Sequence, residues 1–368
     1  MTLESNAQSV GDPSSAPAPP ALSAHDQEFW LENGYLVVPD VVPLERCQAV
    51  QADIIKYLGL DPAAPVEDHY EKVMDQDRGG FVNLRQSQAL WDTRQCPRLY
   101  QVFAEIHGTA KLSVGADQAH MKLPYREAVD AAGTTRTWGN GGVYFGPDDP
   151  RNNGGGLHWD VHGGGLQNAQ TVARKQRGEP TGGLWAGAGL PSMLEYGDGY
   201  ECAPQGVLYL NDRDTNGGGF RCVPGFHRQF NEWLATVPKD RSLEQEDGGH
   251  WIATHPELSG LFAEARTIPA KAGSLLIWHR LLPHTAGRNL SDTPRFAQYI
   301  TMGPAPTDPE LLAERCAESV DAWQKLGEPH GPLSEDAHEA RRQRWEQNTP
   351  PARLTELGKQ LVGLVPWE

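Results

Sequence analysis

Four short runs decide the fold of this chain: GVLYLND at 206–212, GFRCVP at 219–224, SLLIWH at 274–279 and RFAQYITM at 295–302. Each run is rich in β-branched and aromatic residues and is bounded by Gly, Pro, Asn or Asp, which is typical of short strands separated by turns. Similar runs occur at 141–145, 156–162 and 265–270. Many short strands with such boundaries favour a sandwich or jelly roll, so we expect a mainly β fold.

Helical patterns flank this β-rich region. The segment HDQEFWLENGY at 25–35 predicts a short helix that Gly34 ends, and Pro43 begins a second helix with apolar residues at helical spacing. After Pro304 the pattern is helical again, with Asp308 as N-cap. The sequence therefore predicts a β-rich core with helices before and after it.

The simplest domain organisation is a single domain over 23–368. A Ser-, Ala- and Pro-rich leader at 1–22 has few large apolar residues, so we expect it to be disordered. A glycine-rich insertion at about 163–204 interrupts the strand series, and long loops of this kind are usually functional. We expect the insertion to act as a lid or a substrate loop.

Charge and composition narrow the possible partners. The chain has 48 Asp plus Glu and 32 Lys plus Arg, and the formal net charge of −16 disfavours nucleic acid and anionic lipid as partners. The five cysteines are scattered and form no C-x-x-C pair, which argues against a disulfide framework and a structural zinc site. We expect a cytoplasmic protein with a small-molecule substrate and no nucleic-acid or membrane partner; the oligomeric state stays open.

The segment GGGLHWDVHGGG at 154–165 carries the main candidates for chemistry. Residues two apart in a strand face the same side, so His158 and Asp160 are predicted to point together. The strand-like run at 274–289 supplies His284 as a third ligand. Two histidines and one carboxylate leave positions open on an iron(II) ion for a co-substrate and oxygen.

Two other histidines compete for the metal. His162 shares the face of His158 and Asp160 if the strand continues. Three glycines follow it and indicate that the strand ends there, which favours a contact of His162 with a metal-binding residue over direct binding of the metal. His279 competes with His284, although it lies in what should be an irregular connection. Taken alone, H-x-D also fits a hydrogen-bonded polar pair on a sheet face.

Several motifs, in order along the chain, resemble the phytanoyl-CoA dioxygenase (PhyH-like) family of Fe(II)/2-oxoglutarate-dependent oxygenases. They are EFWLENGYLVVPDVVPLERCQAV at 28–50, HWD at 158–160, YLNDRDTNGGGFRCVPGFHR at 209–228 and AGSLLIWHRLLPHTAGRNLSDTPRFAQYITM at 272–302. The resemblance implies a double-stranded β-helix (jelly roll, cupin-like) flanked by helices. It also implies Fe(II), 2-oxoglutarate and O2 as cofactors, with His158, Asp160 and His284 as metal ligands.

The resemblance further assigns the co-substrate contacts. Arg295, eleven positions after His284, matches the arginine that grips the distal carboxylate of 2-oxoglutarate, and a guanidinium suits that task. Arg288 is the closest rival but lies in a predicted turn. The chain departs from the family at Ala286, where a serine is common, so Thr285 is a candidate replacement. Lys122 is a further candidate for a co-substrate contact.

The expected reaction is hydroxylation of an unactivated C–H bond of a small molecule, with release of succinate and CO2. Asp160 disfavours chlorination, because halogenating relatives leave the carboxylate position to chloride. Desaturation, cyclisation and epimerisation stay open. Candidate substrate contacts are Trp159, His162 and Trp185. Two alternatives remain: a jelly-roll metalloenzyme that does not use 2-oxoglutarate, and a non-catalytic binding protein of the same fold.

Overall fold

The structure is a computed structural model that describes residues 20–70, 73, 80–129, 135–138, 157–158, 204–230, 232–233, 260–279, 281–306, 308–328 and 332–367. Most of the predicted leader, the strand predicted at 141–145 and nearly all of the insertion lie outside the described residues.

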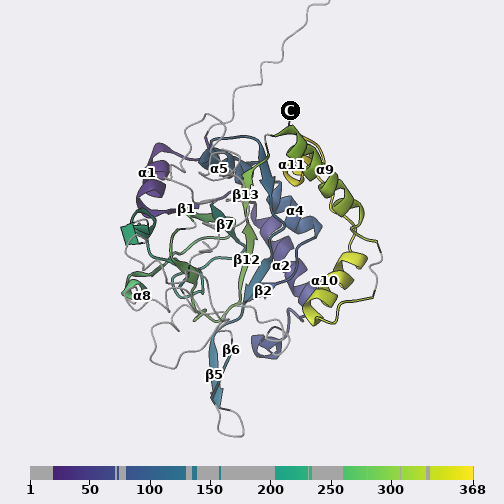
Figure 1. Cartoon of the computed structure of the whole chain (residues 1–368). Helices are drawn as coiled ribbons and strands as arrows, with labels where there is room; N and C mark the ends of the chain where they lie inside the picture. Colours follow the sequence, from purple (N-terminus) through teal and green to yellow (C-terminus); the bar gives the residue numbers. More distant parts are fainter. Residues whose placement is uncertain are drawn as a thin grey trace, which may run out of the picture.

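Two antiparallel sheets form the centre of the molecule (Figure 1). The main sheet has the strand order β1 (Tyr35–Val38), β10 (Leu275–Trp278), β7 (Gln205–Tyr209), β12 (Arg295–Ile300), β4 (Ala119–Lys122), β2 (Phe81–Val82). The second sheet has the order β11 (His284–Ala286), β8 (Phe220–Cys222), β9 (Arg266–Thr267). Two further sheets have two strands each. One pairs β13 (Met302–Pro304) with β3 (Leu112–Val114), and the other pairs β5 (Arg126–Val129) with β6 (Thr135–Trp138).

Strands of the main sheet divide their side chains between two hydrophobic clusters. One face contributes to the larger cluster, which it shares with the helices, through Leu208, Leu275 and Phe296. The opposite face contributes to a smaller cluster, which it shares with Phe220 and Cys222 of the second sheet, through Val207, Leu276 and Ala297. Because alternate residues of a strand face opposite sides, this division shows that the second sheet packs on the inner face of the main sheet.

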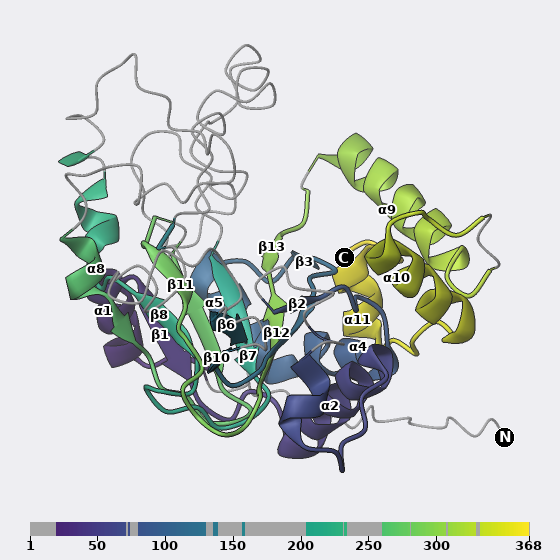
Figure 2. The same ribbon diagram turned by 90° about the horizontal axis from the view of Figure 1, so that it is seen from below.

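Helices cover the outer face of the main sheet and the edges of the molecule. They are α1 (Ala24–Asn33), α2 (Leu44–Leu58), α4 (Gln88–Arg94), α5 (Pro97–His107), α8 (Leu261–Glu264), α9 (Pro309–Gln324), α10 (Ala337–Asn348) and α11 (Glu356–Val362). Single 3-10 turns are η1 (Val66–His69) and η4 (Phe226–Arg228). In Figure 2, α2, α4, α9, α10 and α11 lie on one side of the strands, whereas α1 and α8 lie on the other side. None of the helices in the described ranges is long and apolar enough to span a bilayer.

The predicted flanking helices are confirmed. Gly34 ends the first helix in the left-handed conformation, at φ 72°, and the Asp308 side chain caps α9 by accepting from two backbone N–H groups. The described part of the chain combines antiparallel sheets with helices that are longer than the strands, since α9 has 16 residues whereas β12 has 6. Short strands follow from the frequent Gly, Pro and Asn residues that end them.

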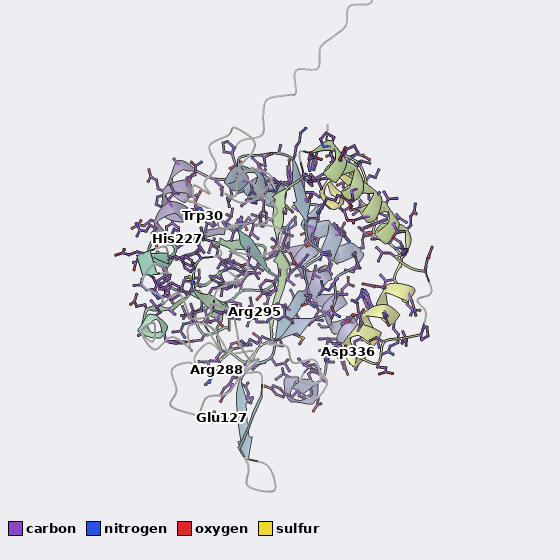
Figure 3. All side chains as sticks on the ribbon, viewed as in Figure 1. Trp30, Glu127, His227, Arg288, Arg295 and Asp336 are labelled. Carbon is purple, nitrogen blue, oxygen red and sulfur yellow. The ribbon has the colours of Figure 1, made fainter. Side chains whose placement is uncertain are left out.

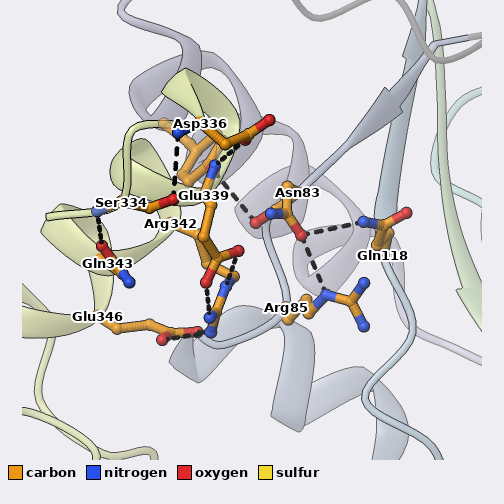
Figure 4. A network of polar contacts seen from close by, with 10 residues as sticks. Asn83, Arg85, Gln118, Ser334, Asp336, Glu339, Arg342, Gln343 and Glu346 are labelled. Carbon is orange, nitrogen blue, oxygen red and sulfur yellow. Dashed lines mark hydrogen bonds and ion pairs between the residues drawn. The ribbon is translucent and has the colours of Figure 1, made fainter.

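A polar network attaches the C-terminal helices to the core (Figure 4). Arg342 of α10 forms ion pairs with Glu339 and with Glu346, the latter at 2.7 Å with the Glu346 side chain only 4% exposed. The hydrogen bond from Arg342 also holds the pKa of Glu339 below its usual value. Asn83 accepts hydrogen bonds from Arg85 (3.0 Å) and Gln118 (3.0 Å) within the same network. The network supplements the apolar contacts of Trp323 and Trp345 with the core.

Three buried histidines predict a stability that falls at mildly acidic pH. Burial lowers the pKa of His107 to about 4 and that of His227 to about 4, and it also lowers the pKa of His279. In the unfolded chain each histidine titrates near 6.5, so between that value and the folded one the unfolded state binds more protons. The free energy of unfolding therefore decreases as pH drops below 6.5, by roughly 1 kcal/mol per histidine at pH 5.5.

Urea unfolding at pH 7.5 and pH 5.5 measures this decrease. The variant His107→Gln keeps a polar group near the Met302 carbonyl, and we expect its free energy of unfolding to depend less on pH than that of the wild type. The exposed His25 offers a matched control, because His25→Gln should leave the pH dependence as in the wild type. Equal stability of the wild type at both pH values would contradict the assignment.

Candidate metal and co-substrate site

His158 and His284 lie side by side, although they are far apart in the sequence. They form an antiparallel bridge with N–H···O distances of 3.0 and 2.9 Å, and their ring centroids are 4.6 Å apart. The ring of His284 also lies 5.7 Å from that of Phe220 and 5.2 Å from that of Trp278, both in the smaller cluster. The structure therefore brings two of the three predicted metal ligands together at the edge of an apolar interior.

The turn before β11 orients His284. Its Nδ1 lies 2.9 Å from the Leu282 carbonyl oxygen. A carbonyl only accepts hydrogen bonds, so Nδ1 carries the proton and Nε2 carries the lone pair that a metal ligand needs. A backbone carbonyl that fixes the ring in this way is a common support for metal-binding histidines. The pair of imidazoles fits a divalent transition metal such as iron.

His279 has different surroundings from His284. Its backbone N–H donates to the Gly34 carbonyl (2.9 Å), and its ring lies 5.2 Å from the ring of His227. The His279 Nδ1 accepts from the Leu281 N–H at 2.8 Å. A Cβ at Gly34 would lie 2.5 Å from Nδ1 of His227, so only glycine fits there. These contacts give His279 a structural role in the turn, and His284 is the histidine placed against His158.

Arg295, labelled in Figure 3, is buried, and alternation along β12 places it on the same inner face of the main sheet as Ala297. Its Nη1 donates to Nδ1 of His120 (3.2 Å), and its guanidinium carbon lies 5.7 Å from the centre of the Tyr209 ring. Arg295 is 1% exposed, and its Nε is buried without a hydrogen-bond partner among the described residues. A buried donor without an acceptor is unfavourable, so the arrangement suits an anionic ligand.

Lys122 lies directly opposite Arg295 in the β4–β12 pairing and is 3% exposed. Opposite residues in an antiparallel pair share a face, so the two cations adjoin each other, and like charges in this position repel. The Lys122 ammonium donates to the carbonyls of Ala286 (3.4 Å) and Gly287 (2.9 Å), two and three residues beyond His284. Lys122 therefore links the strand of Arg295 to the strand of His284.

Alternation along β11 separates Thr285 from the other candidates. His284 and Ala286 pair with Cys222 and Phe220, which face the interior, whereas Thr285 pairs with Arg221. Thr285 therefore lies on the opposite face of the strand and is not brought together with Arg295. The interior position that the resemblance associates with a hydroxyl is occupied by the methyl group of Ala286.

The remaining predicted site residues lie outside the described residues: Trp159, Asp160, His162 and Trp185. Within the described ranges, no three His, Cys, Asp or Glu side chains form a metal-binding group.

One residue of the site was missed. His120 is 1% exposed and accepts the hydrogen bond from Arg295. The signal was available, because His120 precedes Lys122 by two positions and a strand there would place both on one face. The surrounding segment gave no clear strand pattern, so the pair was not recognised.

Two solved structures share the fold. The GlcNAc inducible gene 2 protein of Candida albicans aligns with a TM-score of 0.58 and 14% identity over 94% of this chain and 77% of that one. A hypothetical protein of Escherichia coli, JW0805, aligns with a TM-score of 0.54 and 16% identity over 93% of this chain and 82% of that one. Identities this low establish a common fold only.

Sequence comparison points to one family. Residues 194–297 match the family model described as Phytanoyl-CoA dioxygenase (PhyH). The curated "Putative phytanoyl-CoA dioxygenase" of Dictyostelium discoideum is 32% identical over 103 residues, which cover 28% of this chain and 28% of that protein. The resemblance to the phytanoyl-CoA dioxygenase family is thus confirmed over residues 194–297, the segment that contains His284 and Arg295.

Proposed function

We propose that this chain is a non-haem Fe(II)/2-oxoglutarate-dependent dioxygenase, built as one jelly-roll domain, that hydroxylates a small molecule and releases succinate and CO2. The observation that carries the proposal is the bridge between His158 and His284, with ring centroids 4.6 Å apart. The match of residues 194–297 to the phytanoyl-CoA dioxygenase family supports it.

In this proposal His158, Asp160 and His284 hold the metal. Two imidazoles and one carboxylate suit Fe(II) and leave coordination positions open. When bound, iron and 2-oxoglutarate together supply the activation of O2 and the oxidising power for C–H cleavage. The Leu282 carbonyl keeps the His284 ring in the orientation and tautomer that coordination requires.

Arg295 and Lys122 hold the far carboxylate of 2-oxoglutarate in this proposal. Two buried cations on one face repel each other, and a carboxylate between them offsets that repulsion. The Nε of Arg295 offers a buried donor that has no acceptor within the described ranges of the chain. Phe220 and Trp278 exclude water from the side of His284, which strengthens charge interactions in the site.

The carboxylate of Asp160 is the basis for proposing oxygen insertion over halogen transfer. A carboxylate ligand fills the coordination position that chloride needs. Desaturation, cyclisation and epimerisation use the same ligands, so the reaction products decide among them.

An anaerobic titration of the full chain with Fe(II) and then 2-oxoglutarate tests the proposal. The expected result is a visible charge-transfer band that needs both components, followed by succinate formation when O2 is admitted. A band with iron but no dependence on 2-oxoglutarate would favour a metalloenzyme of another kind. Absence of iron binding would favour a non-catalytic protein, and either outcome overturns the proposal.

A further inference from the structure

The extended segment that begins at His284 continues past the end of β11. The Gly287 N–H donates to the Gly219 carbonyl (2.8 Å), and Asn289 forms a bridge with Gly217. This pairing keeps the register in which His284 lies opposite Cys222. Because the register is unbroken, alternate residues share a face, and Arg288 lies on the same face as His284.

The guanidinium of Arg288 is held in place from one side. Its central carbon lies 4.1 Å from the centre of the Tyr125 ring, and the Tyr125 N–H donates to the Asn289 carbonyl (2.6 Å). Figure 3 shows Arg288 between Arg295 and the β5–β6 hairpin that carries Glu127. Stacking on an aromatic ring uses the flat face of the guanidinium and leaves the N–H groups in its plane unused.

Two of those in-plane nitrogens have no acceptor among the residues that the structure describes. They are Nε and Nη2 of Arg288, and both are buried. They form one edge of the guanidinium, the edge whose two parallel N–H groups match the two oxygens of a carboxylate. Two donors on one edge, without a partner among the described residues, therefore match the shape and charge of a carboxylate.

Nearby carboxylates have other partners. Asp292 pairs with Arg126 at 3.1 Å and its side chain is 95% exposed, and Glu127 accepts the hydroxyl hydrogen bond of Tyr125. No ion pair of Arg288 occurs within the described part of the chain. The charge at Arg288 is therefore not neutralised by a described carboxylate.

We infer that the Nε–Nη2 edge of Arg288 binds a carboxylate of the substrate, which makes the substrate a small carboxylic acid. The inference rests on the proposed function, because it places the substrate beside the metal. Four residues of extended chain separate the Cα atoms of His284 and Arg288 by about 13 Å. The carboxylate of the substrate is thus held away from the metal, so the carbon that is oxidised is remote from the carboxylate. The co-substrate carboxylate has a separate anchor at Arg295.

Binding of two matched probes to the full chain tests the inference: phenylacetate, which carries a carboxylate, and phenylacetamide, its neutral counterpart. Binding is measured with Mn(II) and 2-oxoglutarate present and again in the metal-free protein. The expected result is a preference of about tenfold or more for phenylacetate in the wild type. Arg288→Gln should abolish the preference, and Arg288→Lys, which keeps the charge but not the edge, should reduce it. Arg126→Gln is the matched control and should keep the preference.

Three outcomes overturn the inference: no preference in the wild type, a preference that survives in Arg288→Gln, or weaker 2-oxoglutarate binding in Arg288→Gln. The last would assign Arg288 to the co-substrate. Failure of the proposed function is a different result, because the wild type would then show no Fe(II)/2-oxoglutarate band. The metal-free measurement still tests the carboxylate preference in that case.

Discussion

Replacement of His284 by alanine is expected to weaken Fe(II) binding at least about 100-fold and to abolish succinate formation. Loss of a group that only supports a ligand costs about 10- to 100-fold in metal affinity, so loss of a ligand should cost at least as much. His284 is 5% exposed and its Nδ1 is bound to the Leu282 carbonyl, so Nε2 is the atom that would coordinate a metal. The measurement is a competitive titration of Fe(II) or Co(II) against a chelator.

A matched variant separates coordination from folding. His279 lies five residues earlier on the same turn and is also buried, but its Nδ1 accepts from the Leu281 N–H. His279→Asn places an amide oxygen near the position of Nδ1, so this variant should keep metal affinity close to the wild type. Metal binding that survives in His284→Ala and is lost in His279→Asn would reverse the assignment of the distal ligand.

Replacement of Arg295 by alanine is expected to raise the concentration of 2-oxoglutarate needed for half-maximal succinate formation by roughly 10- to 100-fold. The side chain is buried opposite Lys122, and its Nε is a donor that no described residue accepts from. Saturating co-substrate should restore much of the rate, because the metal ligands are untouched. The measurement compares KM for 2-oxoglutarate with the rate at saturation.

Arg295→Lys provides the control for that effect. A lysine keeps the positive charge but offers no planar pair of donors, so KM should rise by less than in Arg295→Ala. Both variants lose the hydrogen bond to His120, and thermal melting would show how far each is destabilised. Unchanged KM in two folded variants would give Arg295 a structural role with His120 and would contradict the co-substrate assignment.

The parts of the site that the sequence predicts are those set by local geometry and motif spacing. The pattern H-x-D gives two side chains on one face, and the spacing of eleven positions from His284 to Arg295 follows the motif order of the resembling family. The structure brings His158 and His284 together in one bridge, while their role as metal ligands and that of Asp160 stay predictions. Helix boundaries can be predicted from the sequence in the same way, because Gly34 ends α1 and Asp308 caps α9 through local geometry alone.

Other features depend on pairings between distant segments. His120 was not recognised, because its function appears only when β4 pairs with β12 and places it beside Arg295. Arg288 was assigned to a turn, whereas the structure extends the pairing of β11 as far as Asn289. Periodicity within one segment carries no information about which strand becomes its neighbour, so such contacts are settled by tertiary packing.

The unbroken pairing from His284 to Asn289 fixes a distance in the proposed enzyme. If His284 binds the metal and Arg288 binds the substrate carboxylate, one extended strand carries both residues, and the distance between their backbone positions is set by covalent chain geometry. In a series of acids of increasing chain length, the oxidised carbon would then lie a constant number of carbons from the carboxylate. The position of oxidation in the product, more than the reaction rate, would report on this distance.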